Sequence, residues 1–169
     1  MINPIYRKFI SVYPNILFFA FFILCYMYHV SYAYAFIGYI GNSIVNVGLK
    51  QMFRHAIGDA GNRPAPYTPS NSAFDNAVTA IWPAHKNNIA YGFPSGHAQS
   101  VGYFMAFAHQ FLPWRTWHLG WIVAALSIAL WLMHTRIAVR RHTALQLLFG
   151  FAFGVATFRA FHYLFTVKM

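Results

Sequence analysis

The sequence predicts an all-α, polytopic membrane protein, a helical bundle of about five transmembrane helices in one domain over residues 1–169. Composition is the first reason, because 59% of the residues are hydrophobic and only 8% are charged. Soluble domains carry about 25% charged residues. Distribution is the second reason, because the charged residues stand between long uncharged apolar stretches. Such stretches cross a bilayer as helices, since a helix rises about 1.5 Å per residue and the hydrocarbon core is about 30 Å thick.

The first uncharged stretch, Phe9–Leu49, is too long for one crossing and fits two. A break at residues 29–32 divides it, so we expect one helix over Ser11–Met27 and a second over Ala33–Phe53. The N-terminal part also resembles a secretory signal peptide, because two basic residues precede an apolar run and small residues follow it. We expect a retained span rather than a cleaved signal.

Residues 55–93 interrupt the apolar pattern and are expected to form an extramembrane loop. They contain four prolines, several Asn and Ser residues, and both acidic residues of the chain. Within this loop, Ser72–Trp82 has apolar residues at helical spacing. A short helix at the lipid interface and a plain surface loop both fit this pattern.

Three further helices are expected after the loop. The third begins near Ser95 and ends before a turn at Pro113–Arg115, and the fourth covers Thr116–Thr135. The fifth runs over Thr143–Thr166 and contains a GxxxG pair that begins at Gly150. Paired small residues at this spacing favour close packing between membrane helices.

The charge balance restricts the chemistry of the protein. Twelve Lys and Arg residues stand against two acids, Asp59 and Asp75, for a formal net charge of +10. This excess indicates an anionic partner, and lipid or phosphate fits better than nucleic acid because the basic residues lie between apolar segments. Two carboxylates are too few for a two-metal site, so we expect no metal and no cofactor, with nine histidines as the main titratable groups. The single cysteine, Cys25, excludes an intrachain disulfide.

Three polar clusters interrupt the apolar background. The first is Lys50 with Arg63-Pro64, the second is Pro94–His97, and the third is Arg136 with His142. The first follows the second helix, the second opens the third helix, and the third opens the fifth helix. Because successive spans alternate in direction, all three clusters are predicted to lie on one face of the membrane.

These residue types suit a phosphate. A helix that begins at Ser95-Gly96 offers free backbone N–H groups and a favourable dipole to an anion. Arg63 and Arg136 can each bind two phosphate oxygens, and Lys50 adds a point charge. Two histidines suffice for the remaining work, one as a nucleophile on phosphorus and one as the acid and base.

In this order, the clusters resemble the signature of the type 2 phosphatidic acid phosphatase superfamily. That signature reads Lys, a spacer and Arg-Pro; then Pro-Ser-Gly-His; then Ser-Arg, five residues, His, three residues and Asp. The resemblance implies that His142 is the nucleophile, which forms a phosphohistidine, and that His97 is the acid and base. The phosphate-binding residues that it implies are Lys50, Arg63, Ser95, Gly96 and Arg136.

Two positions depart from the signature. Twelve residues separate Lys50 from Arg63, where six are usual in the family, so Arg54 is an alternative first-cluster cation. Gln146 stands where the family has Asp, one helical turn after His142. Its amide oxygen can accept the Nδ1 proton and orient the imidazole, but it supplies no negative charge. We therefore predict a catalytic role for Gln146 as a partner of the nucleophile.

The stretch His142-Thr143-x-x-Gln146, with Tyr91–Ser95 and Ala98-Gln99, is similar to the dolichyl diphosphatase branch. That resemblance implies an isoprenoid diphosphate as the favoured lipid substrate. The alternative enzyme is a phosphatase for phosphatidic acid or phosphatidylglycerophosphate. The alternative without activity is a lipid-binding scaffold that keeps the fold, which the long first cluster and the uncharged Gln146 favour.

Two arguments disagree about which side of the membrane holds the clusters. That face carries an excess of Lys and Arg, so the positive-inside rule makes it cytoplasmic. The family resemblance implies the lumenal or extracytoplasmic side, and we expect the latter for a multi-pass protein surrounded by membrane lipids. The oligomeric state does not follow from the sequence. His134 and the other remaining histidines are assigned no role.

Overall fold

The computed structural model describes residues 23, 26, 29, 32–64, 80, 91–111 and 119–166. The regular structure of this part of the chain is helical, apart from an isolated antiparallel bridge between Asn62 and Tyr91. Its elements, in order, are α2 (Tyr32–Ile57), η1 (Gly58–Gly61), α5 (Gly96–Phe111), α6 (Leu119–Ala138) and α7 (Ala144–Thr166). The predicted all-α class is confirmed for these residues. The expected helices over Ser11–Met27 and Ser72–Trp82 fall almost entirely outside them.

The helix bounds follow local signals in the sequence. α2 continues past its predicted end at Phe53, because no helix breaker occurs before Gly58. Gly58 has φ of +51°, the left-handed conformation that commonly ends a helix. At the start of α5, the hydroxyl of Ser95 accepts a 3.4 Å hydrogen bond from the Ala98 amide, which is an N-terminal cap.

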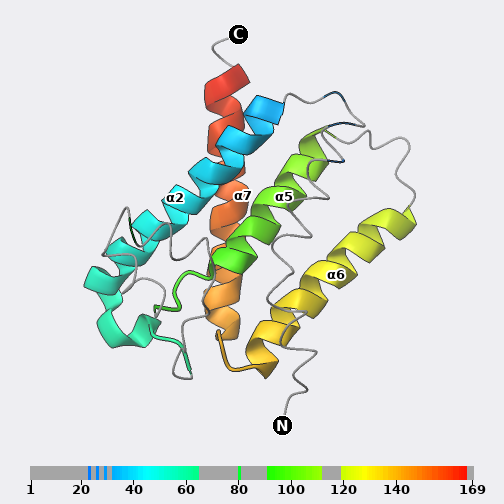
Figure 1. Cartoon of the computed structure of the whole chain (residues 1–169). Helices are drawn as coiled ribbons and strands as arrows, with labels where there is room; N and C mark the ends of the chain where they lie inside the picture. Colours follow the sequence, from blue (N-terminus) through cyan, green and yellow to red (C-terminus); the bar gives the residue numbers. More distant parts are fainter. Residues whose placement is uncertain are drawn as a thin grey trace.

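The helix ends that carry the three polar clusters lie together (Figure 1). The C-terminal ends of α2 and α6 and the N-terminal ends of α5 and α7 lie at one end of the bundle. The C-terminal end of α7 lies at the opposite end of the bundle. This arrangement is the one that the alternation of helix directions predicted for the three polar clusters.

Glycines allow α5 and α7 to pack closely. A Cβ atom on Gly154 would overlap the carbonyl oxygen of Gln99, and one on Gly150 would overlap that of Ser95. Across the same contact, a Cβ on Gly102 would overlap the α7 backbone. The GxxxG pair therefore has the packing role that its spacing predicted, because only hydrogen atoms fit between these backbones.

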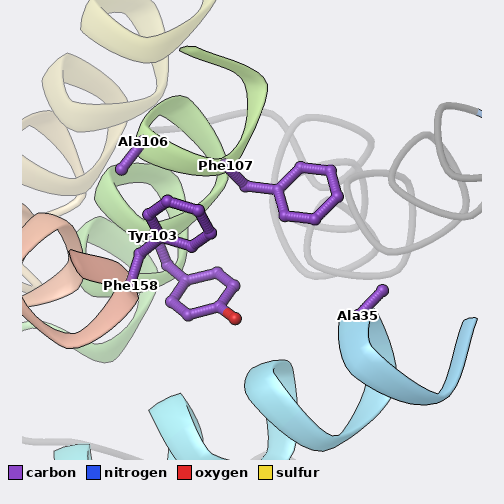
Figure 2. Close-up of a cluster of buried hydrophobic side chains, with 5 residues drawn as sticks. All are labelled: Ala35, Tyr103, Ala106, Phe107 and Phe158. Atoms are coloured by element: carbon purple, nitrogen blue, oxygen red, sulfur yellow. The ribbon is translucent and has the colours of Figure 1, made fainter. Parts of the chain in front are cut away.

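Apolar side chains join the helices away from the site. Figure 2 shows one cluster of buried side chains from three helices, with the Tyr103 hydroxyl directed towards α2. Its members are Ala35 of α2, Tyr103, Ala106 and Phe107 of α5, and Phe158 of α7. A second buried cluster joins Val101 of α5 to Ala129 and Leu132 of α6.

One segment of the described chain, Ala144–Phe165 in α7, is long and apolar enough to cross a membrane. α5 has 16 residues and spans about 24 Å at 1.5 Å per residue. That length is shorter than the hydrocarbon core, which is about 30 Å thick. The predicted count of five spans therefore stays a prediction, with α7 as the crossing that the described chain supports.

Candidate active site

His142 is placed by the turn that joins α6 to α7. Arg140 adopts φ of +52°, and its amide donates to the Ile137 carbonyl at 2.8 Å. The Arg136 carbonyl accepts the amides of Arg141 at 3.0 Å and His142 at 3.3 Å. The bonds from Arg140 and Arg141 form a Schellman motif. The five residues between Arg136 and His142 thus form the end of α6 and a turn that brings the His142 amide back to the Arg136 carbonyl.

Thr143 and Gln146 form a capping box at the start of α7. The Gln146 amide donates to the Thr143 hydroxyl at 3.2 Å, and the Thr143 amide donates to Gln146 Oε1 at 3.1 Å. This exchange turns the Gln146 side chain back over the helix start, where Oε1 lies 3.3 Å from His142 Nδ1. The structure therefore places Gln146 where the sequence predicted an orienting partner.

The carboxamide of Gln146 also reaches the first cluster. Its Nε2 donates to the carbonyls of Gly61 at 3.2 Å and Asn62 at 2.9 Å. Its backbone carbonyl accepts the Ser95 amide at 3.0 Å. One residue is thus bonded to all three segments that carry the predicted site residues.

Lys50, and not Arg54, lies at the site. The Lys50 side chain is buried and its Nζ donates to the Tyr91 carbonyl at 3.1 Å. Lys50 also acts electrostatically on His97 and His142. Arg54 is exposed one turn further along α2. The long interval before Arg63 is taken up by the rest of α2 and by η1, which return the chain to the site.

Arg63 faces the reactive side of His142. Its Nη1 lies 3.5 Å from His142 Nε2. The carboxamide oxygen of Gln146 can only accept, so His142 Nδ1 carries the hydrogen and Nε2 carries the lone pair. A phosphate positioned for attack by His142 Nε2 would therefore also contact the Arg63 guanidinium.

The second cluster differs in one respect from the prediction. The expected anion cradle included a free Ser95 amide, but that amide is donated to the Gln146 carbonyl. Ser95 is fully buried, and its hydroxyl caps α5 while keeping its own hydrogen to donate. Gly96 and His97 are the first two residues of α5, and helical geometry leaves their amides without partners in their own helix.

His97 lies within the electrostatic reach of the other clusters. Four residues interact electrostatically with the His97 imidazole; from the strongest to the weakest they are Arg136, His142, Arg63 and Lys50. The structure therefore brings the predicted acid and base, the predicted nucleophile and three predicted phosphate cations to one end of the bundle. The roles of these residues remain predictions.

Burial and positive charge act together on His142, which precedes the membrane-crossing segment of α7. Burial lowers the pKa of His142 well below its usual value, and the cations of Arg63, Lys50 and Arg136 lower it further. The hydrogen bond with Gln146 opposes this shift. A neutral imidazole with an available Nε2 lone pair is the form that a nucleophile requires.

Carboxylates take no part in the described site. Among the described residues Asp59 is the single acid, and its carboxylate accepts a hydrogen bond from Asn62 Nδ2 at 2.9 Å. Within the same part of the chain, no group of three His, Cys, Asp or Glu side chains is placed to hold a metal ion.

The sequence did not lead us to a buried amide network behind the site. Asn46 Nδ2 donates to Gln99 Oε1 at 2.8 Å, and Gln99 Nε2 donates to the Asn42 carbonyl and side chain at 2.9 and 3.0 Å. A Cβ on Gly96 would lie 2.9 Å from Asn46 Oδ1. A signal for this network was present, since Asn42, Asn46 and Lys50 recur every four residues on an apolar helix.

Two relatives among proteins of known function share sequence with this chain. A lipid A 1-phosphatase of Rhizobium etli is 32% identical over 118 residues, which is 69% of this chain and 44% of that protein. A lipid A 1-phosphatase of Rhizobium johnstonii is 33% identical over 107 residues, which is 63% of this chain and 38% of that protein. The chain therefore spans less than half the length of these relatives. No solved structure matches it.

These relatives bear a different name from the dolichyl diphosphatase branch that the third cluster resembles, so the comparisons support the superfamily and leave that branch without support. The family model described as the PAP2 superfamily matches residues 32–169. That range includes α2, α5, α6 and α7 and all three polar clusters. The chain belongs to the PAP2 superfamily.

Proposed function

We propose that this chain is an integral membrane phosphatase that removes phosphate from a lipid phosphate or diphosphate through a phosphohistidine on His142. The observation that carries the proposal is the pairing of His142 Nε2 with Arg63 Nη1 at 3.5 Å, with the Nδ1 side held by Gln146. A nucleophile of defined tautomer beside a phosphate-binding cation is the arrangement that phosphoryl transfer requires.

The reaction proceeds in two steps. In the first, His142 Nε2 attacks phosphorus and the bond from phosphorus to the leaving oxygen breaks, which is the lipid oxygen of a monophosphate or the bridging oxygen of a diphosphate; His97 gives its proton to that oxygen. In the second, His97 takes a proton from water as the water oxygen attacks the phosphohistidine, and inorganic phosphate leaves. The cations of Lys50, Arg63 and Arg136 stabilise the charge on the phosphoryl oxygens in both steps.

No divalent metal is needed in this mechanism. The whole chain contains two carboxylates, while protein cations supply the positive charge that a metal would otherwise provide. Phosphate release should therefore persist in excess EDTA. Loss of activity in EDTA that Mg²⁺ restores would contradict this part of the proposal.

The lipid itself has two candidates. The relatives' name favours the 1-phosphate of a lipid A-like glycolipid. The third cluster favours an isoprenoid diphosphate, through its resemblance to the dolichyl diphosphatase branch. We place the glycolipid phosphate first, because the contacts of Gln146 with backbone and His142 account for that glutamine without reference to the lipid chain.

The decisive experiment is phosphate release by the purified protein in detergent. The panel contains a lipid A-type 1-phosphate, an isoprenoid diphosphate, phosphatidic acid and phosphatidylglycerophosphate, each with a His142→Ala control. Radioactive phosphate from the preferred lipid should appear on the wild-type protein as an acid-labile, base-stable adduct. No release from any member of the panel would favour the inactive lipid-binding scaffold.

A further inference from the structure

Gln146 makes more contacts than orientation of a histidine requires. A carboxamide has two donor hydrogens and two acceptor lone pairs. In Gln146 all four are used: Oε1 accepts from the Thr143 amide and His142 Nδ1, and Nε2 donates to the carbonyls of Gly61 and Asn62. The direction of the amide is therefore fixed, because backbone carbonyls cannot donate and a backbone amide cannot accept.

The donor half of Gln146 holds the segment that leads to Arg63. The Gly61 carbonyl also accepts the Gly92 amide at 3.1 Å. A Cβ on Gly61 would overlap the Tyr91 ring and hydroxyl, so this turn is pressed against the residues that precede α5. Arg63 follows directly after the two carbonyls that Gln146 binds.

The residues packed around the Gln146 carboxamide restrict which side chain can occupy its position. A Cβ on Gly92 would lie 2.8 Å from Gln146 Oε1 and 2.9 Å from Nε2, so a larger residue at 92 would displace the carboxamide. A carboxylate at position 146 would keep the capping box and the contact with His142. It would also set its second oxygen against the two carbonyl oxygens of Gly61 and Asn62, with no hydrogen to donate.

We propose that Gln146 is a positioning residue with two separate functions, in which its oxygen orients His142 and its NH₂ group holds Gly61–Arg63 so that Arg63 faces the same phosphate. This inference rests on the proposed function for the identity of the bound phosphate. It explains why an amide, rather than a carboxylate of the same length, occupies this position. His142 and the backbone that leads to Arg63, which are far apart in the sequence, are thereby bonded to the two halves of one carboxamide.

A double-mutant cycle between Gln146 and Arg63 tests the proposal. Gln146→Glu keeps the acceptor oxygen and loses the donors, and the probe is inhibition of the purified protein by orthovanadate. We expect inhibition to weaken roughly 10-fold in the wild-type background, because loss of a hydrogen bond that positions a binding residue commonly weakens binding by this amount. In an Arg63→Ala background it should weaken less than about 2-fold, because the effect acts through Arg63.

The same cycle distinguishes positioning from charge. If the added carboxylate merely repelled vanadate, Gln146→Glu would weaken inhibition equally in both backgrounds, and the proposal would be wrong. Gln146→Met is uncharged and loses both the acceptor oxygen and the donors, so it should lower kcat in both backgrounds and raise KM further only where Arg63 is present. Thr143→Ala removes the hydroxyl that accepts the Gln146 backbone amide but keeps the backbone amide that binds Oε1, so it should lower the melting temperature and leave vanadate inhibition unchanged.

Hydrogen–deuterium exchange separates this inference from the proposed function, because it needs no turnover. Exchange of the backbone amides over residues 59–63 should rise in Gln146→Glu and stay unchanged in Thr143→Ala. Unchanged exchange in Gln146→Glu would overturn the inference even if the protein hydrolyses lipid phosphates. Absence of hydrolysis by the wild type, with the expected exchange, would overturn the proposed function and leave the contact between Gln146 and this turn established.

Discussion

His142 has a defined tautomer because the group nearest its Nδ1 nitrogen is an amide oxygen that can only accept. The same oxygen completes a capping box with Thr143, so the contact that orients the imidazole also begins α7. A carboxylate in that place would add negative charge to the imidazole. The glutamine adds no charge, so burial and the surrounding cations hold the pKa of His142 below its usual value.

Activity at acidic pH tests the electrostatics of His142. Burial and the nearby cations lower the pKa of His142, so its neutral form persists at pH values that protonate an ordinary histidine, below about 6.5. We expect Gln146→Glu to raise this pKa and move the acidic limb of the kcat profile to higher pH, because a carboxylate stabilises the imidazolium. The wild type and the variant are compared with the same lipid phosphate, so ionisation of the substrate affects both profiles equally. An acidic limb that does not move belongs to another group.

The two site histidines should differ sharply from a third one nearby. His142→Ala and His97→Ala should each reduce kcat by about 10²- to 10⁴-fold, as expected for loss of a nucleophile or of an acid and base. His134→Ala should have a mild effect, since His134 is exposed on α6. Phosphate release and circular dichroism of each variant check activity and fold. A His142→Ala protein with a large share of wild-type activity would contradict the assigned nucleophile.

At the scale of helices, two kinds of contact keep the ends of α2, α5 and α7 in register. Glycines bring the backbones of α5 and α7 into direct contact. A buried set of amides, Asn42, Asn46 and Gln99, bonds α2 to α5. Lys50 lies one turn beyond Asn46 on α2, and Gly96 lies against Asn46 on α5. The network thus sets the position of a predicted phosphate cation relative to the start of α5.

Substitutions at two glycines should have opposite effects on stability. Gly154→Ala places a methyl group on the Gln99 carbonyl and forces α5 and α7 apart, at a cost of about 1–3 kcal/mol. Gly48→Ala is the matched control, because nothing lies within 4 Å of its Cβ and α2 gains about 0.5–1 kcal/mol from the better helix former. Thermal unfolding of both variants in the same detergent compares them. Equal melting temperatures would show that the close contact of α5 and α7 is not rigid.

Loss of the amide network should affect both stability and phosphate binding. Asn46→Leu leaves the buried Oε1 of Gln99 without its partner, at a cost of about 1–3 kcal/mol. We expect KM to rise as well, because Lys50 and Gly96 lose their common support. Ser43→Ala is the control, since the Ser43 hydroxyl bonds within α2 to the Tyr39 carbonyl. The double variant Asn46→Leu/Gln99→Leu should be less destabilised than the sum of the single variants. Additive losses would argue against a coupled network.

At the scale of the whole molecule, α7 links the site to the opposite end of the bundle (Figure 1). Its apolar segment Ala144–Phe165 is long enough to cross a bilayer. Large hydrophobic side chains are exposed on the outer surfaces of the helices, including Ile44 of α2, Leu130 of α6 and Leu148 of α7. A surface of this kind is typical of contact with lipid tails. A single multi-pass domain over residues 1–169 remains the prediction that these features support.

Labelling of single cysteines tests the crossing of α7 and the side of the membrane that holds the site. Cys25→Ser removes the only native thiol. In that background, we expect Arg140→Cys to react with an impermeant maleimide from the extracytoplasmic side, because the α6–α7 turn adjoins the site. Lys168→Cys should react only after permeabilisation. Reaction of both from one side would contradict the crossing, and the reverse pattern would place the site in the cytoplasm, as the positive-inside rule favours.

The helical class, the bounds of four helices to within a few residues and the gathering of three polar clusters at one end all follow from the order of residues. They depend on the spacing of charges between apolar stretches and on helix signals such as Ser95 and Thr143, which act on neighbours in the chain. Interactions over one helical turn are nearly independent of the rest of the molecule. The contact of His142 with Gln146 belongs to this class, since four residues separate them.

Three features depended on contacts between distant parts of the chain. Lys50 and Arg54 share one face of α2, so the choice of Lys50 follows from how far along the helix the neighbouring segments pack, which residue spacing does not set. The Ser95 amide is donated to the carbonyl of Gln146, so the anion cradle is smaller than a helix start by itself implies. The carbonyls of Gly61 and Asn62, which hold the carboxamide of Gln146, are separated from it by 85 and 84 residues. Backbone carbonyls occur at every residue, so only the folded chain selects which of them a side-chain amide meets.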